Sequence, residues 1–100
     1  MLIAHLTFTV APDQRAMAVN TLLAEASTVR SMPGCLTFRP FALPEDATTI
    51  GVLHEWDSEE AFNAYLASDA FKNSGTTLRP LMTAPPVSKR FHAERLEVIN

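Results

Sequence analysis

The sequence predicts an α+β protein of the ferredoxin-like type, with the element order β-α-β-β-α-β and an antiparallel sheet. Three observations support this prediction. Four short segments favour strands through their apolar alternation or their position between breaks, although the last alternates poorly. Two longer segments repeat apolar residues at helical spacing. Clear breaks stand at Pro33-Gly34 and at Pro85-Pro86.

The first half of the chain predicts a strand, a helix and a second strand. The first strand covers residues 2–10, and every second residue from Leu2 onward is apolar. A helix is expected over residues 12–31, with Asp13 as its cap. The second strand is expected over residues 35–42.

The second half begins with a hairpin and ends with a charged strand. A turn at residues 43–46 leads into a third strand over residues 48–56. We expect Asp57 or Ser58 to cap the next helix, and Glu60 stands in capping-box position relative to Asp57. Ser68-Asp69 restarts or bends this helix. The last strand is expected over residues 87–98.

Size and composition set limits on the class of protein. One hundred residues, 47% of them hydrophobic, indicate a single domain over residues 1–100. The net charge of −3 and the lack of a basic cluster argue against nucleic acid as a partner. One cysteine excludes an internal disulfide. No apolar run reaches ~18 residues and the first segment lacks the features of a signal peptide, so we expect a cytoplasmic protein without membrane contact.

Two helices can cover only one face of a four-stranded sheet. We expect the other face to carry a large apolar patch, formed by Ile3, Phe41, Ile50, Val52 and Trp56. Because such a patch is unusual on a monomer, the sequence predicts a homodimer packed sheet against sheet, a dimeric α+β barrel. A half-polar cavity between sheet and partner is then expected, lined by His5, Thr7, Thr37, Arg39 and His54.

Three segments resemble the antibiotic biosynthesis monooxygenase family: residues 32–36, residues 55–62 and residues 64–71. The resemblance implies the dimeric barrel fold, and its members include cofactor-independent oxygenases of polyphenols as well as haem-degrading enzymes. The chain departs from the family at two places. Tyr65 stands where many members have histidine. Residues 73–75 (Asn-Ser-Gly) occupy the region of the iron-ligating histidine of haem-degrading members, so haem degradation is disfavoured.

The chemistry-bearing residues suggest an aromatic substrate. His54 or His5 could act as the catalytic base that deprotonates a phenol, because imidazole titrates near neutrality. Trp56 could stack on the ring, Tyr65 could hydrogen-bond an oxygen, and Arg39 could neutralise an anion. Each also has a structural alternative, as a core aromatic, a satisfied histidine or a strand-edge arginine. Thr7, Val52 and Phe62 complete the predicted substrate-binding set.

The preferred hypothesis is a cofactor-independent monooxygenase that oxidises a quinol-like or anthrone-like phenol with O2. The alternative is a non-catalytic small-molecule-binding barrel, or an isomerase-like member of the same superfamily. The three histidines show no metal-ligand spacing, and no glycine-rich phosphate loop is present. We therefore expect neither a metal nor an organic cofactor.

Overall fold

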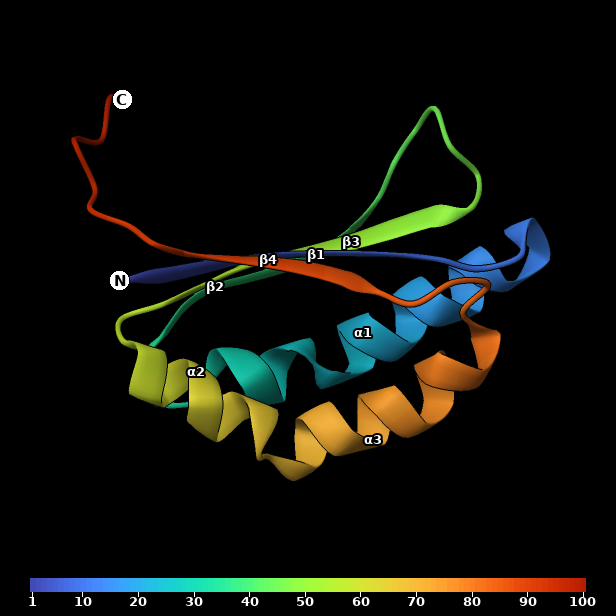
Figure 1. The fold of residues 1–100 in the computed structure, drawn as a ribbon, viewed down its shortest axis with the longest axis horizontal. Coiled ribbons are helices and arrows are strands. Elements are labelled where there is room, and N and C mark those ends of the chain that lie inside the picture. The colour runs from blue at the N-terminus through green and yellow to red at the C-terminus, as the bar shows by residue number, and fades with distance from the viewer.

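The computed structural model describes residues 1–100 as two layers, a four-stranded sheet with all helices on one face (Figure 1). The strands are β1 (Leu2–Thr9), β2 (Cys35–Ala42), β3 (Thr49–Trp56) and β4 (Val87–His92). The helices are α1 (Arg15–Arg30), α2 (Glu59–Leu66) and α3 (Asp69–Leu78), with 3-10 turns η1 (Pro12–Gln14) and η2 (Arg79–Leu81).

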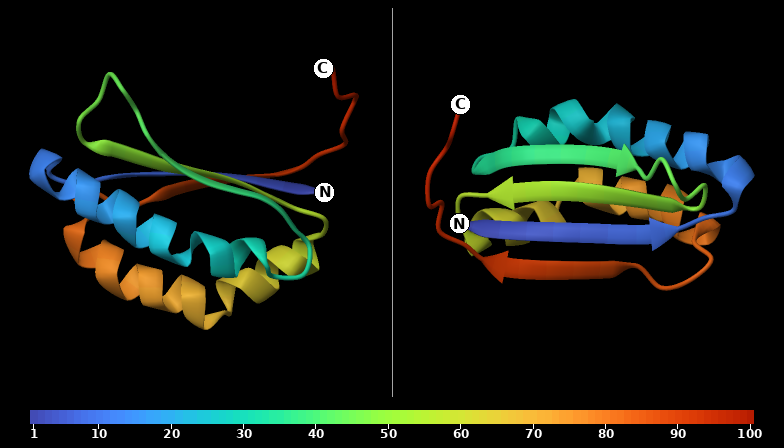
Figure 2. Two further views of the ribbon diagram at one scale, coloured as in Figure 1. Left: turned by 180° about the vertical axis from the view of Figure 1, so that it is seen from behind. Right: turned by 90° about the horizontal axis from the view of Figure 1, so that it is seen from above.

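The strand order β2-β3-β1-β4 is visible in the right view of Figure 2. Each neighbouring pair is antiparallel. The predicted ferredoxin-like topology is confirmed. None of the helices has the length and apolar character that crossing a bilayer requires.

Two predicted boundaries are wrong. The last strand ends at His92 rather than at residue 98, because its neighbour β1 begins at Leu2, which pairs with His92. Beyond that point the chain has no strand to pair with. The first helix is preceded by η1, and α1 begins only at Arg15; Asp13 makes no cap because Gln14 and not Asp13 occupies the N-cap position.

Serine side chains cap the two helices that follow β3. Ser58 Oγ accepts a hydrogen bond from the backbone N–H of Ala61 at 3.1 Å, so Asp57 is not the cap and Glu60 is not in capping-box position. Ser68 Oγ accepts from the backbone N–H of Phe71 at 3.2 Å. The predicted restart at Ser68 is confirmed, because it separates α2 from α3.

The register of β1 on β3 decides which side chains face the helices. Leu2 is opposite Trp56, and Ala4 is opposite His54. Directly opposed residues project to the same face of a sheet. The apolar face of β1 and the Ile50–Trp56 face of β3 therefore bury together under the helices.

Three residues expected on the uncovered face lie in the core instead. Ile50, Val52 and Trp56 are each at most 1% exposed. The prediction placed this face of β3 away from the helices. It was wrong because the strongest apolar faces of neighbouring strands share one core.

The uncovered face of the sheet still carries apolar side chains. Ile3 and Phe41 lie on it as predicted, since they pair with Glu55 and Gly51 of β3. The Phe41 ring lies over Gly51 and occupies the space where a Cβ would project. Further apolar side chains on this face are Leu53, Val87 and Phe91.

Gly34 is the one residue whose backbone requires glycine. Its φ is +82°, and an added Cβ would lie 2.5 Å from Asp57 Oδ1 and 2.6 Å from the Ala61 Cβ. We expect Gly34→Ala to lower the free energy of unfolding by about 2 kcal/mol or more, from strain and overlap together. Urea denaturation followed by circular dichroism measures the change.

Gly75→Ala is the matched control, because the new Cβ would meet Arg79 Nε at an ordinary 3.5 Å. This helical position should gain up to ~1 kcal/mol. Equal destabilisation by both substitutions would contradict the local argument.

Candidate active site between the sheet and the helices

A cavity of about 270 Å³ lies between the sheet and the helical layer. Most of its lining is apolar, with histidine, tyrosine, serine and arginine side chains among the walls. The lining residues are Leu6, Leu22, Val52, His54, Phe62, Tyr65, Leu66, Phe71, Arg79, Pro86, Ser88 and Arg90. An apolar hollow with a few polar groups is the usual form of a small-molecule site.

Four of the predicted site residues border this cavity. His54 and Val52 come from β3, and Phe62 and Tyr65 come from α2. The strand supplies two residues of one face, and the helix supplies two residues one turn apart. The cavity is thus built within one chain and not between sheet and partner as predicted.

The other predicted site residues lie elsewhere. His5 and Thr7 alternate with the buried residues of β1 and lie on the uncovered face, where Arg39 of β2 also lies. These three residues are separated from His54 by the thickness of the sheet. His5 and His54 therefore cannot serve one site within a single chain. The prediction grouped them because the two faces of β3 were assigned incorrectly.

Trp56 lies behind His54 and does not border the cavity. Its ring is fully buried and stacks on the Tyr65 ring with centroids 5.1 Å apart and planes at 24°. Trp56 Nε1 donates a hydrogen bond to His54 Nδ1 at 3.0 Å. The structure therefore gives Trp56 a positioning contact with the histidine, and leaves it out of reach as a stacking platform.

The bond from Trp56 determines which nitrogen of His54 carries the proton. An indole N–H can only donate, so Nδ1 must present its lone pair. The neutral imidazole consequently carries its hydrogen on Nε2. Nε2 has no hydrogen-bond partner in the protein, and no fully buried side-chain nitrogen is left unpartnered, so Nε2 remains accessible. His54 thus offers a hydrogen-bond donor at the cavity wall.

Burial keeps His54 and Tyr65 uncharged near neutral pH. Desolvation, with a smaller contribution from the Arg90 charge, lowers the pKa of His54 to about 4. Desolvation, followed by the charges of Cys35 and Glu25, raises the pKa of Tyr65 to about 12. Near neutral pH, His54 Nε2–H and the Tyr65 hydroxyl are therefore both hydrogen-bond donors, and His54 Nδ1 is already occupied by Trp56.

Aromatic rings surround His54 on several sides and fix its orientation. The ring centroids of Phe62, Tyr65 and Phe38 lie 5.6, 5.7 and 5.8 Å from that of the imidazole. Packed rings restrict side-chain rotation, so the Nε2–H direction is set before any ligand arrives. Such preorganisation is what a site for a developing anion needs.

Two arginines of the cavity were not predicted. Arg79 begins η2, and Arg90 lies on β4 opposite Ala4 of β1. The alternation of β4 was masked by its charged residues, so the sequence did not indicate that Arg90 faces the helices. Arg79 follows the end of α3, and no local pattern directs its side chain inward.

Metal ligands are not grouped in this structure. No three His, Cys, Asp or Glu side chains lie close enough together to hold a metal ion. Cys35 is half-buried and packs against the core, and burial raises the pKa of its thiol. Glu55 accepts a hydrogen bond from Thr37 Oγ1 at 2.7 Å on the uncovered face.

A split βαβ sheet with an internal cavity defines a ferredoxin-like α+β domain with a ligand-sized hollow. The profile of the family described as "Antibiotic biosynthesis monooxygenase" matches residues 1–74. The chain belongs to the antibiotic biosynthesis monooxygenase family. The predicted resemblance is thereby confirmed. No curated protein matches the sequence.

Solved structures share the whole fold at low sequence identity. A Deinococcus radiodurans protein named for the same family superposes with a TM-score of 0.89 at 20% identity, with both chains fully covered. A Caulobacter crescentus protein named likewise gives 0.87 at 25% identity, with 94% of this chain and 90% of the other covered. A Nitrosomonas europaea protein gives 0.88 at 13% identity, with 93% and 98% covered.

Acid pH should destabilise the protein through His54. The pKa of His54 is about 4 in the folded state and ~6.5 in the unfolded state. Between these two pH values the imidazole is protonated in the unfolded chain but not in the folded chain. Stability is therefore retained above pH 6.5 and lost as the pH falls toward 4. We expect a loss of roughly 2 kcal/mol between pH 7 and pH 4.5, measured by urea denaturation.

The variant His54→Phe should lose this pH dependence, whatever its stability at pH 7. His5→Gln is the control, since it removes an exposed histidine and should retain the wild-type profile. Asp46, whose pKa is lowered to about 2 chiefly by hydrogen bonds from Thr49 and Thr48, acts only below pH 4. An unchanged slope in His54→Phe would contradict the assignment.

Proposed function

We propose that the protein is a monooxygenase that oxidises an electron-rich phenol, of the quinol or anthrone type, with O2 in the cavity beside His54. Membership of the antibiotic biosynthesis monooxygenase family supports the reaction class. The observation that carries the proposal is the neutral His54, whose Nε2–H is held at the wall of an aromatic-lined cavity.

The substrate itself supplies the electrons in this reaction. A phenolate is far more easily oxidised than its phenol, so stabilising the anion promotes electron transfer to O2. The substrate radical and superoxide combine at ring carbon, and the resulting peroxide loses water. One oxygen atom enters the product as a carbonyl and the other leaves as water. The substrate gives up four electrons in all, which balances the reduction of O2.

His54 acts in this scheme as a hydrogen-bond donor and not as the base first predicted. Because Nδ1 already accepts from Trp56 and Nε2 already carries hydrogen, the neutral ring has no lone pair to offer a phenol. Nε2–H instead donates to the phenolate oxygen, and neutral Tyr65 can supply a second donor. These donors lower the pKa of the bound phenol, whose proton leaves to solvent.

Oxygen consumption tests this assignment directly. Purified protein is mixed with an anthrone under air, in the presence of a chelator, and O2 uptake is followed with an electrode. We expect His54→Phe to lower kcat/KM about 100-fold, the loss typical of one preorganised donor to an oxyanion. His5→Gln, on the opposite face of the sheet, should retain activity.

An equal loss of kcat/KM in His54→Phe and His5→Gln would contradict the assignment of the active site to the cavity beside His54. Leu66 is half-buried at the cavity wall, and Leu66→Trp replaces its aliphatic side chain with a bulky indole. This variant should raise KM for the anthrone without altering the fold seen by circular dichroism. Ligand binding without any O2 uptake would support the alternative of a non-catalytic binding protein.

We further propose that two copies pack through the uncovered sheet face. Leu53 is 36% exposed and Phe91 is 53% exposed on this face. In Figure 1 the β2–β3 loop and the segment after β4 both project beyond the sheet on the side away from the helices. The two segments flank the uncovered face, where a second copy could pack between them. That segment adds Leu96, at 94% exposure, to the apolar surface. A two-fold dimer would cover the same patch on both copies.

Leu53→Asp should shift the dimer toward monomer by placing a carboxylate in this interface. We expect at least a tenfold weaker dimerisation constant, measured by analytical ultracentrifugation over a concentration series. Leu23→Asp, on the outer surface of α1 with Leu23 at 50% exposure, is the matched control and should leave the association unchanged. Wild-type protein that stays monomeric at high concentration would refute the dimer.

A further inference from the structure

Two guanidinium groups border the cavity without a carboxylate partner. Arg79 forms no ion pair or side-chain hydrogen bond, and Arg90 donates only to Ser88 Oγ at 3.2 Å. The one contact between a basic side chain and a carboxylate in the structure joins His92 Nε2 to Glu59 at 3.3 Å. The chain has 11 acidic and 8 basic residues, so carboxylates are not scarce. No arginine or lysine of the chain pairs with a carboxylate, and Arg79 and Arg90 differ from the others in bordering the cavity.

Two other arginines of the chain make structural hydrogen bonds that Arg79 and Arg90 lack. Arg15 Nη1 donates to the carbonyls of Leu43 and Asp46 at 3.1 and 2.8 Å. Arg30 donates twice to the Phe38 carbonyl, at 3.0 and 2.8 Å. Both therefore tie the helical layer to the sheet or its loop. Arg79 and Arg90 make no such tie; all donors of Arg79 and the terminal nitrogens of Arg90 remain free for a ligand.

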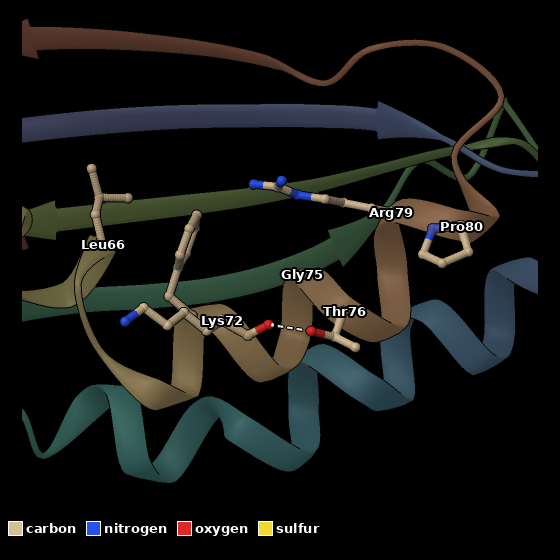
Figure 3. Close-up of a pocket in the computed structure, with 7 residues that line it drawn as sticks. Leu66, Lys72, Gly75, Thr76, Arg79 and Pro80 are labelled. Atoms are coloured by element: carbon tan, nitrogen blue, oxygen red, sulfur yellow. Dashed lines mark hydrogen bonds between the residues drawn. The ribbon is translucent and has the colours of Figure 1, made fainter.

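Arg79 lies where the cavity meets the surface. An outer groove of about 520 Å³ along α3 shares Leu66, Phe71 and Arg79 with the cavity. Figure 3 shows the Arg79 side chain reaching from the end of α3 back toward Leu66, over the groove. The Lys72 ammonium points away from Arg79 in the same view. A ligand that passes from the groove to His54 therefore meets the Arg79 guanidinium.

Arg90 holds the second charge on the strand side of the cavity. Its guanidinium carbon lies 4.9 Å above the centre of the Phe62 ring, which fixes the group beside an aromatic wall. Its charge also contributes to the lowered pKa of His54, so its field reaches that wall. Arg79 and Arg90 thus place two positive charges at the exposed rim of the cavity, where they can attract an anionic ligand.

We propose that the physiological ligand is an aromatic carboxylate, whose ring occupies the cavity and whose carboxylate is bound by Arg79 at the mouth, with Arg90 adding to the attraction. The planar fork of guanidinium matches the two oxygens of a carboxylate. The apolar walls accept the aromatic ring within a cavity of about 270 Å³. This inference rests on the proposed function only in taking the cavity as the substrate site.

Isothermal titration tests the inference with two probes that differ by one group, a hydroxynaphthoate and the corresponding naphthol. The wild-type protein should bind the carboxylate at least about tenfold more tightly, the gain expected from a charge-assisted hydrogen-bond pair. This preference should shrink when NaCl is raised, because salt screens the attraction.

Variants show which residue is responsible for the preference for the carboxylate over the naphthol. Arg79→Gln should abolish most of it while the naphthol keeps its affinity, and Arg90→Gln should reduce it in part. Lys72→Gln is the matched control, since its ammonium points away from the cavity mouth, and the preference should persist.

The outcomes separate this inference from the proposed function. Equal affinities for the two probes would overturn the carboxylate preference, while O2 uptake with a neutral anthrone would still support the monooxygenase. A preference that survives Arg79→Gln would overturn the assignment to Arg79. Binding of neither probe would overturn the inference together with the cavity as a ring site.

Discussion

The hydrogen bond from Trp56 to His54 is the interaction on which the site depends. It joins two residues of the same face of β3 and is fully buried beneath α2. A donor-only indole makes Nδ1 the acceptor, and this leaves Nε2–H as the group presented to the cavity. Burial keeps the ring neutral, since a charged imidazole in this position would lose its hydration. The contact with Trp56 thereby sets the tautomer and the direction of His54, and burial sets its charge.

The two faces of the sheet serve different purposes because the helices cover only one of them. The covered face combines the core with a cavity, whose walls come from strands, helices and a 3-10 turn. The uncovered face carries Phe41 over Gly51, together with half-exposed Phe91 and Val87. The proposed ligand site and the proposed contact with a second copy are thus separated by the thickness of the sheet. A substitution on one face can leave the other intact.

The cavity combines features that ordinary core packing does not require. A well-packed core has few voids larger than water, yet here a void adjoins His54 Nε2, the Tyr65 ring and two arginines without acidic partners. Burying any of these polar groups in charged form without a hydrogen-bond partner would destabilise the folded state. Arg79 and Arg90 avoid that cost by remaining exposed at the rim, while His54 and Tyr65 avoid it by remaining neutral. The arrangement is consistent with an anionic aromatic molecule entering from the α3 side.

The sequence by itself determined the topology, most element boundaries and the family, because alternation, helical periodicity and proline–glycine breaks act over a few neighbouring residues. It also brought forward His54, Tyr65, Phe62 and Val52, which do meet at one cavity. Only the tertiary structure decided which face of β3 is covered, because that depends on the register with β1, a contact between residues some fifty positions apart. The same pairing separated His5, Thr7 and Arg39 from His54. It also brought in Arg90, whose direction depends on its partner Ala4 and on no pattern within β4.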